Sequence, residues 1–285
     1  MNTITTKQRI IDSPITRILL GLLVCFIAFI LAQQLTGKIL DLTVSDKNFR
    51  NLIKGIISSA AVIGGYSFFF RKYEKRKIVE FSTKGIAKYI FIGTLIGILL
   101  QSLTILVIYL AGNIEIVAVN PISYIIIPFT VAFSVAIFEE ILIRGVIFRI
   151  LEEKLGSYHS LFITTIIFGA LHLGNPNSTL LSGLCVGIEA GFLMGAAYIY
   201  TRNLWFPIAI HFAWNFMQSG IFGAITSGNE KTSGLLTTKI TGNQLITGGE
   251  FGPEATIQAM FFCVLATIIL LQLSKNKIIR PYWKK

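Results

Sequence analysis

Charged residues are scarce in this chain, and their scarcity excludes most classes of soluble protein. Of its 285 residues only 14% are Asp, Glu, Lys or Arg, and 53% are hydrophobic. A soluble domain carries about a quarter charged residues. Apolar runs close to the ~20 residues of a membrane-spanning helix recur from end to end. The composition therefore predicts a polytopic membrane protein.

Cysteine, internal repeats and cleavage signals are also missing or rare. The three cysteines lie in apolar runs without paired spacing, so packing is expected rather than disulfides or metal ligands: Cys25, Cys185 and Cys263. No repeat or low-complexity tract is visible, and nothing suggests a second soluble domain. The first apolar run lacks a small-residue cleavage pattern, so a cleaved signal peptide is not expected.

The apolar runs predict an all-α membrane bundle of about eight transmembrane helices. The expected spans are 15–35, 52–70, 87–111, 121–150, 158–174, 179–200, 204–225 and 254–273. We divide the chain into N-terminal helices (1–120, about three spans), a core (121–273) and a basic tail (274–285). The connections 112–120 and 226–253 are expected to be loops, the second being rich in Gly, Thr and Ser.

Lysine and arginine predict the orientation. The segment after the second span and the C-terminal tail are densely basic, and the positive-inside rule places both in the cytoplasm. An even number of spans puts the N-terminus on the same side and the 112–120 and 226–253 connections outside. The net charge of +11 is then explained by orientation and by contact with anionic lipid headgroups, not by nucleic-acid binding. We expect a multi-pass protein of the cell membrane, of bacterial type.

Ionisable residues within predicted spans mark candidate functional positions, because they are costly in lipid. The chain has three histidines, and two of them fall inside apolar runs. The candidates in spans are Glu139, Glu140, Arg144, His172, Glu189 and His211.

Helical spacing predicts how these side chains meet. Glu140 and Arg144 are four residues apart and can pair on one face, whereas Glu139 lies about 100° further round the helix. His211 and Asn215 are also separated by four residues, as are Phe168 and His172. Each of these three helices thus carries a narrow stripe of polar or aromatic side chains. Three such stripes that face one another would form a polar pocket within the bundle.

The chemistry that suits this pocket is activation of water. A partly desolvated glutamate can act as a general base, a histidine can orient the water or protonate a leaving amine, and an amide can donate to an oxyanion. Two histidines and a glutamate are also a catalytic zinc set, so Glu139, His172 and His211 are the candidate metal ligands. The chain has no HExxH sequence, and whether a metal such as Zn²⁺ takes part stays open.

Purely structural interpretations exist for each residue. Glu140 and Arg144 can be a structural ion pair, and His211 with Asn215 can join helices by hydrogen bonds. His172 alone can be a core histidine. Glu189 has no assigned role and is expected to be structural, and His159 is expected to be solvated. The occurrence of all these residues together favours a functional site.

The pattern resembles the CPBP intramembrane proteases, also called the CAAX protease and bacteriocin-processing (Abi) family. That family shows EExxxR, FxxxH and HxxxN on separate spans, and here the motifs are "EEILIR" (139–144), "FGALH" (168–172) and "HFAWN" (211–215). The resemblance covers roughly residues 120–260. It implies that 121–273 is the catalytic core, with the active site inside the bundle.

The resemblance implies a role for each motif residue. Glu139 would be the general base, with His172 oriented to the same water, and Glu140 with Arg144 would support that geometry. His211 and Asn215 would stabilise the oxyanion. The sequence places His172 nearer the outer end of its span and His211 nearer the inner end. Tilted or broken helices, or a span boundary that is wrong by one turn, would bring them level.

We thus expect an intramembrane endopeptidase that hydrolyses a peptide bond in a membrane-associated or lipidated peptide. The alternatives are a non-catalytic bacteriocin-immunity or scaffold protein and a proton-coupled transporter. Against the transporter, no inverted repeat is visible. The sequence names neither the substrate nor the oligomeric state.

Overall fold

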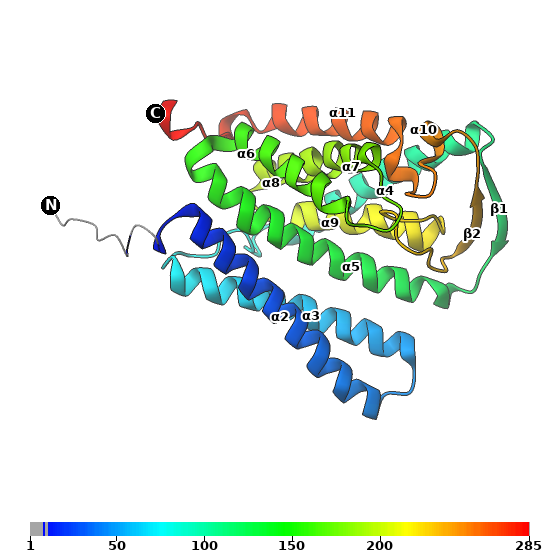
Figure 1. Ribbon diagram of the computed structural model, residues 1–285, viewed down its shortest axis with the longest axis horizontal. Helices are drawn as coiled ribbons and strands as arrows, with labels where there is room; N and C mark the ends of the chain where they lie inside the picture. Colours follow the sequence, from blue (N-terminus) through cyan, green and yellow to red (C-terminus); the bar gives the residue numbers. More distant parts are fainter. Residues whose placement is uncertain (1–7, 9–10, 285) are drawn as a thin grey trace.

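The computed structural model describes residues 8 and 11–284 as a bundle of helices with one small sheet at one end (Figure 1). The long helices are α2 (Pro14–Thr43), α3 (Lys47–Tyr73), α4 (Ile86–Leu110), α5 (Ile126–Glu140), α6 (Arg149–His172) and α11 (Ile257–Leu273). Shorter α-helices are α7 (Leu180–Val186), α8 (Leu193–Thr201), α9 (Trp205–Asn215) and α10 (Gln244–Thr247).

Three π-helical segments continue α-helices without interruption: η2 (Ile141–Phe148), η3 (Gly187–Phe192) and η4 (Phe216–Ile221). Four 3₁₀ turns complete the helical structure: η1 (Ile122–Ile125), η5 (Pro253–Ala255), η6 (Lys275–Lys277) and η7 (Tyr282–Lys284).

The surface of the bundle shows that the chain is a multi-pass membrane protein. Large apolar side chains stay exposed along the outer helices, such as Leu19, Leu35 and Phe91 at 61%, 59% and 65%. Exposed apolar area of this extent fits lipid and not water.

The starts of helices are set by short polar side chains: Ser13 caps α2 and Asp46 caps α3 by accepting backbone N–H groups.

Five helices of the described chain are long and apolar enough to cross a membrane: 14–43, 47–73, 86–110, 122–172 and 180–201. The fourth contains a break, because Gly156 has φ 74° and ψ 171° and separates two helical runs. α11 is apolar but has only 17 residues. The all-α membrane bundle is confirmed, whereas the count of eight spans stays a prediction.

α4 holds α9 very close, and α9 carries one of the candidate histidines. Gly93 and Gly97 of α4 face α9, and a Cβ atom at Gly97 would lie 2.4 Å from the carbonyl oxygen of Ile210. Only glycine permits this approach of two helices. The close contact fixes the height of His211 in the bundle.

The expectation that 112–120 and 226–253 are loops is wrong in one respect. β1 (Ile114–Val119) and β2 (Leu236–Ile240) pair antiparallel, with Ile114 opposite Ile240 and a bulge between Ile116 and Ala118. The sheet lies at the opposite end of the bundle from the C-terminus (Figure 1). Both connections therefore lie at the same end of the molecule.

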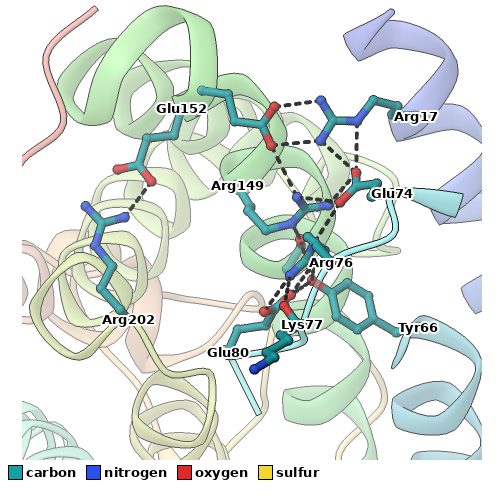
Figure 2. A network of polar contacts seen from close by, with 11 residues as sticks. Arg17, Tyr66, Glu74, Arg76, Lys77, Glu80, Arg149, Glu152 and Arg202 are labelled. Atoms are coloured by element: carbon teal, nitrogen blue, oxygen red, sulfur yellow. Dashed lines mark hydrogen bonds and ion pairs between the residues drawn. The ribbon is translucent and has the colours of Figure 1, made fainter. Parts of the chain in front are cut away.

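An ion-pair network ties α2, α6 and the 74–85 connection together at the other end (Figure 2). Glu74 binds both Arg17 and Arg149, and Arg76 binds Glu80. The sequence predicted this segment to be basic, but not that its arginines would be paired with glutamates.

The three cysteines are buried and free.

Candidate functional site

The site is centred on an ion pair that is completely buried. Glu140 is the last residue of α5, Arg144 lies in η2, and both side chains are 0% exposed. Arg144 Nη1 donates to Glu140 Oε1 at 3.0 Å. The predicted i, i+4 contact is present in the fold.

Arg144 also links two parts of the bundle. Its Nη2 donates to the carbonyl oxygens of Ala190 (2.7 Å) and Gly191 (3.1 Å) in η3. The guanidinium carbon lies 5.0 Å from the centre of the Phe168 ring, a cation–π distance. Arg144 therefore joins η2 to α6, which carries the second motif, and to η3, which carries none.

All three π-helical segments adjoin site residues. η2 begins after Glu140, η3 supplies the carbonyls that Arg144 binds, and η4 begins after Asn215. A π-helix frees backbone carbonyls from their usual partners and is frequent at functional sites. The N–H of Arg149, for example, donates to Arg144 O and Val146 O and passes over Gly145 O.

The freed carbonyl of Gly145 is bound from outside its helix. The Tyr66 hydroxyl, on α3, lies 3.0 Å from Gly145 O, and Arg149 Nε donates to the same oxygen at 3.0 Å. Tyr66 is completely buried and also bonds Glu80 (Figure 2). The network at the end of the bundle thus reaches the residue next to Arg144.

Glu139 lies in a different environment from its neighbour. Its side chain is 29% exposed and lines an open cavity of about 390 Å³. No described residue hydrogen-bonds its Oε2 atom. The wall is largely apolar, with Phe26, Val131 and Phe138 among its residues, and the 226–232 segment adds polar groups at the rim.

His172 lines the same cavity from the last turn of α6. Its Nδ1 lies 2.9 Å from the carbonyl oxygen of Phe168. Because a carbonyl only accepts, Nδ1 carries the hydrogen and the lone pair of a neutral ring is on Nε2.

His211 lies between the two glutamates. Its Nδ1 donates to Glu140 Oε1 at 3.0 Å, and its Nε2 is 3.9 Å from Glu139 Oε2. His211 is buried, whereas Asn215, one turn later, is half-buried and lines the main cavity. The structure brings together all six predicted residues.

A second, small cavity of about 30 Å³ lies directly behind the first. His172, His211 and Asn215 line it, together with Glu189 and Glu254. The two histidines thus line one small cavity, although the predicted spans place them toward opposite ends. Their helices meet at the same level in the bundle.

Glu254 is a site-adjacent residue that the sequence did not indicate. It is 4% exposed, and its carboxylate accepts from the backbone N–H of Ser227 and from Gln218 Nε2 (3.3 Å). Glu254 follows the long polar connection 226–253, and a glutamate in such a position is normally expected to be exposed to solvent. Glu189 is equally buried, and its Oε1 has no partner among the described residues.

The candidate site does not form a three-ligand metal site among the described residues. No three His, Cys, Asp or Glu side chains of these residues are placed to hold a metal ion, the trio of Glu139, His172 and His211 included. The hydrogen bond from His211 Nδ1 to Glu140 does not itself oppose a metal, because a metal-ligating histidine commonly donates its other ring N–H to a carboxylate.

Fold and site define a class: a membrane helix bundle that encloses glutamates and histidines beside an open cavity. Residues 121–217 match the family described as Type II CAAX prenyl endopeptidase Rce1-like. This segment holds all six predicted residues. The match confirms the resemblance to the CPBP intramembrane proteases over these residues.

One relative supports the same assignment. A protein of Bacillus subtilis (strain 168), named "Putative membrane peptidase YdiL", is 30% identical over 115 residues. The alignment covers 40% of this chain and 42% of the relative, so the chain spans less than half of that protein's length. No solved structure gives a significant match to the chain.

Proposed function

We propose that this chain is an intramembrane endopeptidase in which Glu139 activates water to hydrolyse a peptide bond. The observation that carries the proposal is the division between the two glutamates. Glu140 is neutralised by Arg144 and His211, whereas the Glu139 side chain is 29% exposed and lines the open cavity. A general base needs a carboxylate within reach of the proton it removes.

The proposed reaction uses one water molecule and no covalent intermediate. Glu139 removes a proton as the water oxygen bonds to the substrate carbonyl carbon, whose oxygen becomes negative. The C–N bond then breaks, the oxyanion collapses to a carboxylic acid, and the proton held by Glu139 passes to the leaving amine. Water and peptide yield an acid and an amine, so no other reactant is needed.

The remaining residues support the developing charges. Asn215 Nδ2 can donate to the oxyanion from the cavity wall. The Glu140 carboxylate accepts from His211 Nδ1 and orients the ring, whose Nε2 lies 3.9 Å from Glu139 Oε2 and can donate to the oxyanion when the ring is protonated. His172 Nε2, fixed by the Nδ1 contact to Phe168, can accept from the attacking water.

The cavity suits a segment that enters from the bilayer. Phe26 of α2 and Phe138 of α5 contribute to its apolar wall, and polar rim residues such as Asn229 and Thr232 can contact an extended backbone. We propose a membrane-associated peptide, lipidated or not, as substrate. We also propose that the protein resides in the cell membrane with both termini in the cytoplasm.

The test is cleavage of fluorogenic membrane-peptide libraries by the protein in lipid nanodiscs. Glu139→Gln should lower kcat by about 100-fold or more, the usual contribution of a general base. Glu250→Gln is the matched control, because Glu250 is exposed and lines neither cavity, so it should keep activity within about twofold. Undiminished cleavage by Glu139→Gln would falsify the mechanism.

A further inference from the structure

A groove lies at the end of the bundle that carries the C-terminus, away from the candidate active site. It has a volume of about 590 Å³. Tyr158 and His159 of α6 form one wall, and Lys275 with tail residues 278–281 forms the other. We call it the tail groove.

The tail is held in place against α6 by backbone contacts. The Ser157 N–H donates to Ile279 O, and the Ile279 N–H donates to Ser157 Oγ, both at 2.9 Å. A Cβ atom at Gly156 would lie 2.6 Å from Pro281 N, so the break in α6 is shaped to receive the tail. The groove is therefore a formed feature of the fold.

The charged side chains that line the tail groove are all basic. Lys275, Arg280 and His159 line it, and none of its lining residues is acidic. Lys275 and Arg280 are exposed and form no ion pair with a described residue. The neighbouring network is different, because there Arg202 binds Glu152 and Arg149 binds Glu74 (Figure 2).

Aromatic side chains place the groove at the level of lipid headgroups. The apolar helix α11 ends at Leu273, just before Lys275. Tyr158, Tyr282 and Trp283 are 56%, 63% and 51% exposed, and Trp283 contacts the His159 ring at 5.6 Å. Exposed Tyr and Trp beside the end of an apolar helix are typical of the membrane–water interface.

We propose that the tail groove binds the phosphodiester headgroup of an anionic phospholipid, with phosphatidylglycerol as the probe. Lys275 and Arg280 supply the charge, which is left unpaired in the protein alone. Arginine and lysine together suit phosphate oxygens, and the aromatic residues contact the glycerol and upper acyl region. The site is independent of the peptidase chemistry.

Lipid binding is measured by native mass spectrometry of the detergent-solubilised protein, titrated with phosphatidylglycerol or phosphatidylcholine. The Lys275→Gln/Arg280→Gln variant should bind phosphatidylglycerol at least about tenfold more weakly, because each basic residue near anionic lipid contributes roughly a fivefold factor. Phosphatidylcholine binding should not change.

The matched control is Arg71→Gln/Lys72→Gln, which removes the same two charges from the last turn of α3. It should stay within about twofold of the unmodified protein. Equal losses in both double variants would overturn the proposal in favour of general surface charge, as would equal affinity for the two lipids. Competition by millimolar inorganic phosphate alone would show a free-phosphate site and overturn the lipid assignment. Thermal unfolding in phosphatidylcholine confirms that each variant is folded.

Discussion

Glu139 and Glu140 are adjacent in the chain, yet their carboxylates meet different surroundings. Consecutive helical residues point about 100° apart, so one side chain faces the bundle interior and the other the cavity. Glu140 is 0% exposed and Glu139 is 29% exposed. Two identical side chains thus lie in two different environments because of the helix that carries them.

Removing the charge of Arg144 should destabilise the protein strongly. In Arg144→Met the Glu140 carboxylate loses its buried partner, and breaking one side of a buried pair costs about 3–5 kcal/mol. Chemical unfolding in detergent measures this loss.

The double variant Glu140→Gln/Arg144→Met is the control, because it leaves no uncompensated charge in the bundle. It should recover a substantial part of the loss. An Arg144→Met protein as stable as the unmodified one would contradict the view that this pair is held in a dry interior.

The sequence predicted most of the individual residues of the candidate site. The i, i+4 spacing was sufficient to separate Glu140 from Glu139, because it depends only on helix geometry. It could not show that Glu254 approaches His172 and Glu189 around the small cavity, because that contact depends on how a long connection folds back. Spacing along one helix carries no information about such a return.

At the scale of elements, the π-helical segment η2 is contacted by a residue outside the family match. The Tyr66 hydroxyl of α3 lies 3.0 Å from Gly145 O, whereas the matched segment begins at residue 121. A helix outside the matched segment thus contacts the backbone next to the site residue Arg144.

Tyr66→Phe should lower the free energy of unfolding by about 1 kcal/mol, the net value of a typical buried hydrogen bond. It should also reduce peptide cleavage, because Gly145 adjoins Arg144. Tyr198→Phe is the matched control: Tyr198 is 5% exposed and contacts the Phe148 ring at 5.7 Å, and no described residue hydrogen-bonds its hydroxyl. If both variants behave alike, the hydroxyl of Tyr66 does not support η2.

The helices themselves were predictable, since hydropathy alone places most of them within a few residues. The π-helical segments were not, because their hydrogen bonds are decided by partners such as Tyr66 and Arg144 that come from elsewhere. The β1–β2 pair was missed for a related reason. β1, "IEIVAV", is short and its partner lies more than a hundred residues later.

At the scale of the whole molecule, the ion-pair network predicts sensitivity to acid. Burial would raise the pKa of Glu80, but the hydrogen bond and charge of Arg76, with the Tyr66 hydroxyl, outweigh it and hold that pKa below its ordinary value of 4.5. Burial would also raise the pKa of Glu74, but Arg149, Arg17 and Arg76 outweigh it and hold that pKa below its ordinary value. A lowered pKa in the folded state means that the stabilisation is complete above the ordinary value.

The stabilisation should therefore be lost as the pH falls below about 4.5 and through the lowered pKa values. Thermal unfolding between pH 7 and pH 3 measures it. Glu80→Gln should be less stable at pH 7 and should lose less on acidification than the unmodified protein. Parallel pH curves for the two proteins would show that the network does not govern acid stability.

The strand pair also fixes the parity of the chain's passage through the bilayer. Because β1 and β2 hydrogen-bond to each other, residues 119 and 236 lie on one side, and the chain between them must cross an even number of times. Four helical runs lie in that interval, 122–155, 157–172, 180–201 and 205–221, which is an even number. The break at Gly156 agrees with the strand pairing, because an undivided run from 122 to 172 would leave three runs between the two strands.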